Sequence, residues 1–401
     1  MPRLIADRPV LHTSSDLGRV MAAARAREQA GERVLHLERG EPDFDTPPHI
    51  VEALARAARD GHTHYPHERG VPALREALVA KLARDNGIVT HADDLTVTSG
   101  GTHGLHLAIQ CVLGAGDELL VCSPHWMAVP KMVGFAYGAQ YRSFPLYLEL
   151  QSGAWDAAEL ATRLRAAVRP NTRALYLNTP NNPTGVVLTR EQLQAIADVA
   201  IERDLIVLSD EAYEHLTYDG AAHVSIASLP GMAERTVTVF SFSKSYAMTG
   251  WRVGYVVAPP ALRPVLAPLP AFYSTHGVFP SVQFAALAAV TGPQDEVARM
   301  RASYDERRRL LVSGLAGGTY VRAATPTGAF YAFANVAGAR GPRDLWALVD
   351  EWLAFGVAVL PGTAFGPEYG DWVRLALCTR ADDVAEAARR ITQHTATGVR
   401  A

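Results

Sequence analysis

The sequence predicts an α/β fold in which a mostly parallel sheet is covered by helices and joined to a smaller α+β domain. Short apolar runs alternate with helix-like spacing of apolar residues from about residue 48 to about residue 290, as in strand–helix–strand units. A chain of 401 residues is also long enough for two domains. We therefore expect an N-terminal arm over 1–47 that joins the small domain, a large domain over 48–290 and a small C-terminal domain over 291–401.

The separate elements follow from the spacing of apolar residues, because strands repeat every two residues and helices about every 3.6. In the large domain, the predicted strands are Leu95–Thr98, Glu118–Cys122, Ala174–Leu177, Leu205–Leu208 and Thr236–Phe240. The predicted helices there span 102–113, 156–167 and 190–203. A long helical pattern near 281–312 leads into the small domain, where we expect strands at Ala329–Phe333 and Val373–Leu377 and a helix after Ala381.

Composition narrows the classes of function. The net charge of -3 gives no strong attraction to nucleic acid. No apolar run approaches the roughly 18 to 20 residues that a membrane helix needs, and the N-terminus has too many charges for a signal peptide. Three cysteines do not suggest a disulfide framework. We expect a cytoplasmic protein without a nucleic acid or membrane partner.

The most informative segment runs from Ser241 to Arg252 and contains Lys244. A lysine that forms an imine with a bound aldehyde must sit on a tight turn beside that aldehyde. A phosphate group nearby needs hydroxyl donors and a fork-shaped cation, which Ser241, Ser243 and Arg252 supply. The segment taken alone is equally compatible with a structural loop lysine.

Further polar residues follow other predicted strands, where open parallel sheets bind their ligands. Asp210 closes one strand and Tyr213 comes three residues later, while Asn182 lies in the rigid turn Asn178–Gly185. The glycine-rich segment Thr98–Gly104 lies between a strand and a helix, where backbone amides bind phosphate well. Each of these motifs also has a purely structural explanation, such as Asp210 capping the next helix.

Taken in order, these segments resemble those of the class I/II aminotransferases, which are pyridoxal-phosphate-dependent enzymes of fold type I. The resemblance is greatest to the bacterial aspartate and aromatic aminotransferase subgroup. It extends over nearly the whole chain, from Gly40–Phe44 through Pro326–Tyr331 and Val359–Gly366 to Arg374. It implies a ping-pong transfer of an amino group between an L-amino acid and a 2-oxo acid on pyridoxal 5'-phosphate. A pyridoxal-phosphate-dependent lyase, cyclase or oxidase on the same fold is the alternative.

The resemblance also assigns roles residue by residue, and it implies no metal ligand. Lys244 binds the cofactor and moves the proton, Asp210 pairs with the ring nitrogen, and Tyr213 reaches the ring's phenolic oxygen. The remaining cofactor contacts implied are Gly101, Thr102, Trp126, Asn182, Ser241, Ser243 and Arg252. The implied substrate contacts are Gly40, Trp126, Asn182 and Arg374, with Arg374 gripping the α-carboxylate. Tyr65 matches a tyrosine that reaches the phosphate of the neighbouring subunit, which implies a homodimer.

Two departures from the family pattern bear on the substrate. Several aspartate-using relatives have a lysine at the position of Thr102, and the arginine that others supply from a neighbouring subunit has no counterpart in Tyr273–Pro280. Aspartate is therefore not expected to be the strongly preferred donor, and His103 is expected to face helix packing. Arg39 directly precedes Gly40. It is a candidate for substrate binding, although a side chain that points to solvent or pairs with Glu38 or Glu41 is the more ordinary expectation.

Overall fold

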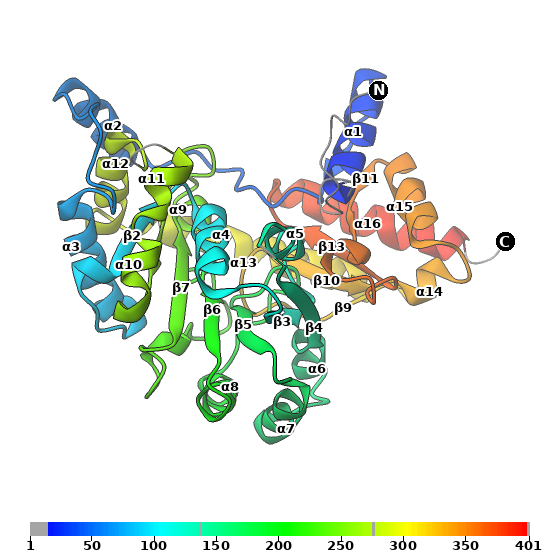
Figure 1. The fold of residues 1–401 in the computed structure, drawn as a ribbon. Coiled ribbons are helices and arrows are strands. Elements are labelled where there is room, and N and C mark those ends of the chain that lie inside the picture. Colours follow the sequence, from blue (N-terminus) through cyan, green and yellow to red (C-terminus); the bar gives the residue numbers. More distant parts are fainter. Residues whose placement is uncertain (1–14, 137, 275–276, 399–401) are drawn as a thin grey trace, which may run out of the picture.

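The computed structural model describes residues 15–136, 138–274 and 277–398. The larger part of the molecule is built around a sheet of seven strands in the order β2-β8-β7-β6-β5-β3-β4 (Figure 1). Its strands are β2 (Leu95–Thr98), β3 (Glu118–Ser123), β4 (Gln140–Pro145), β5 (Thr172–Asn178), β6 (Ile206–Asp210), β7 (Thr236–Ser241) and β8 (Gly254–Val257). Strands β3 to β7 pair in parallel, whereas β8 runs antiparallel to β2 and β7.

Helices cover both faces of this sheet because successive strand residues point to opposite sides. On β5, Ala174 and Tyr176 pack into a core with the helices α4 (Gly101–Val112) and α5 (Val129–Phe135). The alternate residues Leu175 and Leu177 pack on the other face. The helices on that face are α6 (Tyr147–Gln151), α7 (Ala157–Ala167) and α8 (Arg190–Glu202). The parallel, doubly covered sheet that the sequence predicts is therefore present.

Further helices belong to the part of the molecule that is built on this sheet. They are α2 (Pro48–Arg59), α3 (Pro72–Lys81), the π-helical turn η2 (Leu82–Asn86), α9 (Phe242–Ser245), α10 (Arg263–Leu266), α11 (Leu269–Ser274) and α12 (Pro280–Thr291). Short 3-10 turns occur at η3 (Ala92–Asp94), η4 (Ile226–Ser228), η5 (Pro260–Leu262) and η6 (Gly362–Phe365). Helices α2 and α3 both pack against α12.

The prediction of a single helix near 281–312 is wrong. The chain instead forms α12 and a separate helix α13 (Asp295–Ala316), with Gly292 and Pro293 between them. Proline has no backbone N–H and its ring clashes with the preceding turn of a helix, so it ends α12 at this point. The sequence of α12 is rich in alanine and that of α13 in arginine, and this helix-favouring composition on both sides of the break made the pattern look like one helix.

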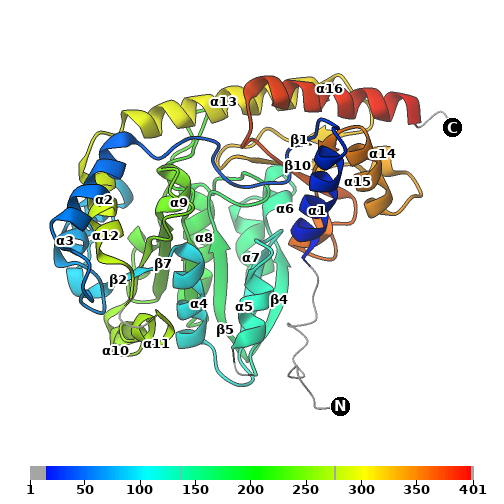
Figure 2. The same ribbon diagram turned by 90° about the horizontal axis from the view of Figure 1, so that it is seen from above.

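The second sheet has four antiparallel strands in the order β12-β13-β10-β9. They are β9 (Arg322–Ala323), β10 (Tyr331–Asn335), β12 (Leu360–Pro361) and β13 (Trp372–Ala376), and β1 (Leu35–His36) pairs separately with β11 (Val357–Ala358). The helices of this part are α1 (Asp16–Gln29), α14 (Ala337–Arg340), α15 (Leu345–Ala354) and α16 (Ala381–Gly398). Figure 2 shows α13 packed along α16, so α13 reaches from the large sheet to the small one.

A bridging segment, residues 38–46, crosses between the two sheets. Its hydrogen bonds join the Glu38 carbonyl to Arg374, the Gly40 carbonyl to Lys244, Glu41 to Thr249 and Thr46 to the Ala247 carbonyl, each at 2.6 or 2.7 Å. Within the same segment, Asp43 forms a 2.6 Å ion pair with Arg307 of α13. The segment is therefore held by the large sheet, the small sheet and the helix that connects them.

No helix in the described part of the chain is long and apolar enough to cross a membrane.

A buried ion pair near the β2 edge gives a testable stability contribution. The Lys81 amine donates to Glu214 and, at 2.8 Å, to Asn86. Burial alone would raise the pKa of Glu214, but the Lys81 charge and the hydrogen bonds lower it to about 2. Replacing Lys81 with alanine leaves Glu214 buried without its cation, so we expect a loss of about 3 to 5 kcal/mol of unfolding free energy near neutral pH.

Urea unfolding of Lys81→Ala measures this loss. The control is Arg84→Ala, because the Arg84–Asp85 pair is largely exposed and should change stability by less than about 0.5 kcal/mol. The folded pKa of Glu214 lies below its ordinary 4.5, so the stabilisation is complete above pH about 4.5 and is lost as pH falls toward about 2. A Lys81→Ala loss below about 1 kcal/mol would contradict the assignment.

Candidate active site

The carboxyl ends of neighbouring parallel strands open into one cavity of about 230 Å³. Asn178 ends β5, Asp210 ends β6 and Ser241 ends β7, and all three line this cavity. The small sheet contributes Arg374 and Tyr331 from the opposite side. Of the residues singled out from the sequence, the cavity lining includes Gly40, Gly101, Thr102, Trp126, Asn182, Asp210, Tyr213, Ser241, Ser243, Lys244, Arg252 and Arg374.

Lys244 lies on the short helix α9, directly after β7. The helix begins because the Ser241 side chain accepts a hydrogen bond from the Ser243 amide at 3.2 Å. The Lys244 amine donates to the Gly40 carbonyl at 2.7 Å. Burial lowers the pKa of Lys244, and the charges of Arg374 and Arg252 add to this effect. A larger share of the neutral amine is therefore available, and that is the form that attacks a carbonyl.

Asp210 is a buried carboxyl group at the end of β6. Its oxygens accept hydrogen bonds from the Tyr176 hydroxyl at 3.0 Å and the Ala212 amide at 3.2 Å. Burial raises the pKa of Asp210 to about 6, although both hydrogen bonds lower it. Among the residues that the structure describes, no basic side chain forms an ion pair with Asp210. The site therefore suits a ligand that brings its own positive charge, such as a protonated pyridine nitrogen.

An anion-binding cradle forms where α4 begins. Gly100 has φ +87°, and a Cβ atom there would lie 2.6 Å from the Arg252 guanidinium. Gly101 opens the helix, and a Cβ atom on it would lie 3.2 Å from the Ser241 side chain. Glycine is thus required for the close approach of backbone amides, hydroxyl groups and Arg252 that a phosphate needs. These residues fit the phosphate of pyridoxal phosphate.

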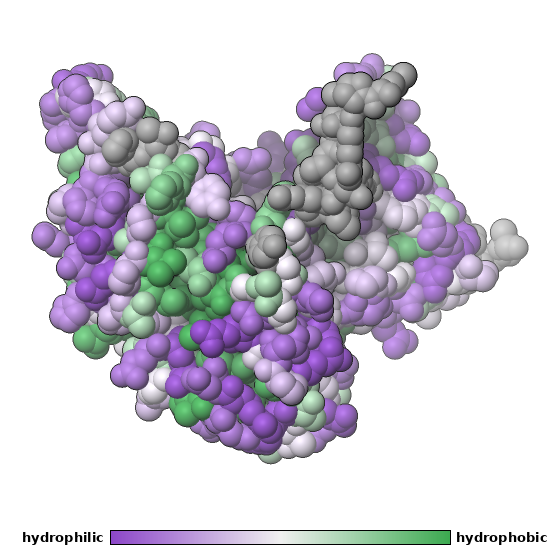
Figure 3. Space-filling model, in the orientation of Figure 1, coloured by the Kyte–Doolittle hydropathy of each residue, from purple (hydrophilic) through white to green (hydrophobic). Residues whose placement is uncertain are grey.

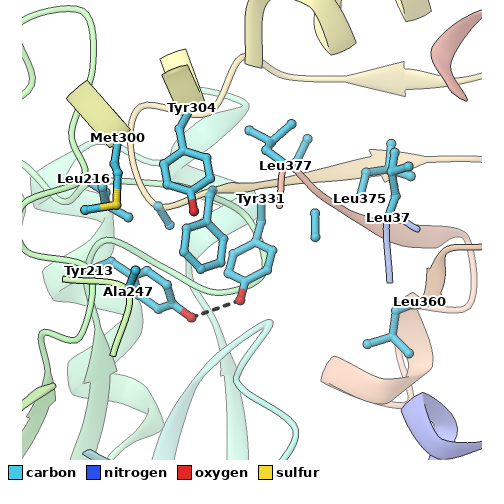
Figure 4. Close-up of a cluster of buried hydrophobic side chains, with 14 of the residues drawn as sticks. Leu37, Tyr213, Leu216, Ala247, Met300, Tyr304, Tyr331, Leu360, Leu375 and Leu377 are labelled. Carbon is cyan, nitrogen blue, oxygen red and sulfur yellow. Dashed lines mark hydrogen bonds between the residues drawn. The ribbon is translucent and has the colours of Figure 1, made fainter. Parts of the chain in front are cut away.

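Tyr213 and Tyr331 meet at the boundary of the two sheets (Figure 4). Their hydroxyl oxygens are 3.1 Å apart, and burial raises the pKa of Tyr213 above its ordinary value. A Cβ atom on Gly40 would come within 2.1 Å of the Tyr331 hydroxyl, which explains the glycine at that position. Tyr331 was not assigned a role from the sequence, although it closes the segment Pro326–Tyr331.

Arg374 projects from β13 toward the cavity. Its guanidinium donates to the Glu38 carbonyl at 2.6 Å and to the Asn182 side chain at 3.3 Å. Its Nε is buried and has no hydrogen-bond partner within the described residues. A buried guanidinium with an unused donor is suited to a carboxylate, which takes two parallel hydrogen bonds. This is the kind of contact that the α-carboxylate of an amino acid would make.

Three other predicted residues lie outside the cavity lining. The Arg39 Nε donates to the Glu38 carboxylate at 3.1 Å, which is the ordinary pairing. Tyr65 is 73% exposed in the loop between α2 and α3. The His103 ring accepts from the Ser99 amide and contacts Tyr273 edge-on. Residues 275 and 276 of the segment Tyr273–Pro280 lie outside the described residues.

Some cavity residues were given no role from the sequence. They are Leu17, Met127, Asn178, Ala212, Thr249 and Tyr331. Leu17 lies in the first turn of α1, away from the strand ends where ligand contacts are expected, and Met127 lies in the loop between β3 and α5. Their apolar side chains carry no chemical signal in the sequence, and only the folded arrangement brings them to the site.

The fold and the site together define a pyridoxal-phosphate-dependent enzyme of fold type I. Residues 32–391 match the family model for aminotransferase class I and II, and the chain belongs to this family. It therefore moves an amino group between an amino acid and a 2-oxo acid on pyridoxal phosphate.

Individual relatives agree with this family membership. The chain is 37% identical to an aspartate aminotransferase of Geobacillus stearothermophilus, with 92% of this chain and 93% of that protein aligned. It is 40% identical to an arginine–pyruvate transaminase of Pseudomonas aeruginosa, with 92% and 91% aligned. The crystal structure of the aspartate aminotransferase from Rhizobium meliloti superposes with a TM-score of 0.91 at 32% identity, covering 98% of this chain and 99% of that one. These relatives differ in the amino acid that their names state, so the family alone does not fix the substrate.

Proposed function

We propose that this aminotransferase works by a ping-pong mechanism in which Lys244 holds the cofactor, Asp210 pairs with its ring nitrogen and Arg374 binds the substrate α-carboxylate. One observation carries the proposal. A buried amine with a lowered pKa, a buried carboxyl group with a raised pKa and an arginine with an unused donor line the same cavity. Perturbed groups of this kind, gathered in one cavity, are typical of catalytic sites.

Each residue has a separate part in this mechanism. When bound, pyridoxal phosphate supplies an aldehyde that condenses with amines and a ring that withdraws electrons from the substrate α-carbon. Lys244 would hold the cofactor through its aldehyde carbon and, once free, would carry a proton between the substrate α-carbon and the cofactor's C4' carbon. Asp210 keeps the ring nitrogen protonated, and Arg374 fixes the orientation of the substrate.

A donor and acceptor screen with purified protein tests the proposal. The protein is incubated with single amino acids and with pyruvate or 2-oxoglutarate, and the amino acid formed from the oxo acid is measured. The proposal requires that one of these oxo acids becomes its amino acid at a rate that depends on both substrates. Release of ammonia, without formation of a new amino acid, would overturn it.

We further propose a cytoplasmic homodimer in which Tyr65 completes the partner's phosphate site. Large apolar side chains are exposed on α11 and just before α12, with Phe272 81%, Tyr273 56% and Phe279 51% exposed. Figure 3 shows apolar surface over α10, α11 and α4. Large apolar side chains that are exposed next to one another are typical of interaction surfaces. The three free cysteines are consistent with a reducing compartment.

A complementation experiment tests the shared site. Tyr65→Ala and Lys244→Ala proteins are each expected to be impaired as homodimers. In a mixed heterodimer, one site combines an intact Lys244 with the partner subunit's Tyr65, so we expect activity to approach half that of the wild type. A heterodimer no more active than the sum of the two homodimers would reject sharing. A stable and active monomer in light scattering would reject the dimer.

A further inference from the structure

Two apolar side chains lie at the side of the cavity that faces α1. Leu17 comes from the first turn of α1 and Met127 from the turn before α5, and both line the same cavity as Arg374 and Gly40. Both side chains are partly buried and pack against the main hydrophobic core. They are therefore held in place, while part of each surface remains open to whatever occupies the cavity.

The position of Leu17 depends on how α1 is fixed to the small sheet. The helix begins at Asp16 and is capped by Ser15, whose side chain accepts a hydrogen bond from the Gly18 amide at 3.2 Å. The Arg19 guanidinium lies 3.8 Å above the Trp346 ring and forms a 3.0 Å ion pair with Asp350 of α15. Because α1 also packs against β11 and β12, Leu17 is presented by the same part of the molecule that carries Arg374.

The cavity has no spare positive charge among the described residues that line it. Its basic side chains are Lys244, Arg252 and Arg374. Lys244 is reserved for the cofactor aldehyde, and Arg252 donates to the carbonyl oxygens of Thr249 and Ser99 beside the phosphate cradle. Arg374 is the partner of the α-carboxylate. A second carboxylate on the substrate would be desolvated without a cation, which is costly.

The same cavity has no spare negative charge among its described lining residues. Asp210 is the acidic residue in the lining, and it is assigned to the ring nitrogen. Near the cavity, Glu41 accepts a 2.6 Å hydrogen bond from Thr249. Glu38 is bonded to His36 and Arg39 through its Oε1 atom, and its Oε2 atom is buried without a hydrogen-bond partner among the described residues. Neither glutamate belongs to the described lining of the cavity, so a basic side chain that enters the cavity would meet no acid there except Asp210.

We propose that Leu17 and Met127 form an uncharged side-chain subsite, so that the amino donor is a neutral L-amino acid with an apolar side chain. This inference rests on the proposed function, because it assumes that Arg374 takes the α-carboxylate. Methionine adapts its shape to different apolar groups, so the subsite accepts aliphatic and aromatic side chains alike. Leucine, methionine and phenylalanine are representative donors.

Asp16 is adjacent to Leu17 in the sequence and provides a test of whether a basic donor is preferred instead. Burial raises the pKa of Asp16, and the charges of Lys131 and Arg19 act against this effect. Asp16 does not line the cavity within the described residues, but it is adjacent in sequence to Leu17, which does. Arginine therefore belongs in the substrate panel, and Asp16→Asn belongs among the variants.

The first experiment measures kcat/KM for leucine, methionine, phenylalanine, alanine, aspartate and arginine. The reaction followed is the first half-reaction of the cofactor-loaded enzyme, so no acceptor is needed. We expect the best apolar donor to exceed both aspartate and arginine by at least about tenfold, which corresponds to about 1.4 kcal/mol of transition-state preference. A lead for aspartate or arginine would overturn the proposal, as would an arginine rate that falls selectively in Asp16→Asn.

The second experiment uses variants of the subsite. Leu17→Ala should lower kcat/KM for leucine and phenylalanine by about tenfold and leave alanine within about twofold, because alanine does not reach the subsite. Met21→Ala is the matched control, since Met21 lies on the same helix but outside the cavity lining. The substitution Leu17→Lys should raise kcat/KM for aspartate relative to kcat/KM for leucine. If Leu17→Ala lowers kcat/KM for alanine as much as for leucine, the proposed subsite is wrong.

A binding measurement separates this inference from the proposed function. Calorimetry gives the dissociation constants of 3-phenylpropionate and succinate, which have no amino group and do not react. We expect 3-phenylpropionate to bind at least about fivefold more tightly, and Leu17→Ala to remove most of that difference. If no donor reacts but this difference is found, the proposed function fails and the subsite stands. If succinate binds more tightly than 3-phenylpropionate, the proposed subsite is wrong, whether or not the enzyme shows transaminase activity.

Discussion

Replacing Lys244 with alanine is expected to reduce turnover by several orders of magnitude, because in the proposed mechanism the same amine holds the cofactor and transfers the proton. The protein as purified should be yellow, and borohydride should abolish its absorbance band by fixing the cofactor to the lysine. In the structure the amine lies in the cavity, 2.7 Å from the Gly40 carbonyl. Steady-state kinetics and the absorbance spectrum of Lys244→Ala measure the loss.

Because the chain contains few lysines, identifying the lysine that carries the reduced cofactor is a specific test. The sequence contains three lysines, Lys81, Lys131 and Lys244. After borohydride treatment and digestion, mass spectrometry should find the reduced cofactor on Lys244 alone. Lys131→Ala is the control, since Lys131 lies on α5 and outside the cavity lining, and it should keep both colour and turnover. An adduct on Lys81 or Lys131, or none at all, would refute the assignment.

Replacing Asp210 with asparagine or alanine is expected to slow proton abstraction by about 10²- to 10³-fold while the cofactor stays bound. The reason is electrostatic, because in the proposed mechanism the carboxylate acts through the charge of the ring nitrogen, and removing one such preorganised group typically has an effect of this size. The rate is measured with donors deuterated at the α-carbon, and cofactor content is measured by absorbance. A variant with a near-normal rate, or one that loses the cofactor first, would contradict this role.

The pKa of Asp210 adds a pH signature in the cofactor-free protein. Its folded value of about 6 lies above the ordinary 3.8, so ionisation favours the unfolded chain. Stability relative to Asp210→Asn should therefore fall as pH rises from about 4 to about 6, and should be level above that range. Urea unfolding across this range measures the trend. If the difference between the two proteins does not change with pH, the pKa is not raised.

Much of the large sheet could be predicted from the sequence because its strands are buried on both faces. Such strands appear as short apolar runs, and Leu95–Thr98 matches β2 residue for residue. Strand β4 was missed because it is the edge strand and most of its side chains are exposed or half-buried. Strand β8 was also missed, since its four residues Gly254–Val257 directly follow the lysine segment and show no alternation.

The candidate site could be predicted where residue type itself carries chemistry. Lys244, Asp210 and Arg374 were singled out in this way, and the structure brings them to one cavity. Leu17 and Met127 could not be found, because a leucine on a helix is usually a core residue and nothing local distinguishes these two. Their position depends on the docking of α1 beside the cavity, which is a property of the tertiary fold and leaves no periodic signal.

The bridging segment over residues 38–46 has a consequence for how the site comes apart. Through Glu38 it is bonded to Arg374, through Gly40 to Lys244, and through Asp43 to α13. Detaching the small sheet would withdraw Arg374 and break the bonds that hold this segment in the same event. The carboxylate-binding arginine and the amine are thus linked through one short segment. Lys244 itself is carried by α9 at the end of β7, so loss of this segment would remove the Gly40 contact of the amine and the Glu38 contact of Arg374 together.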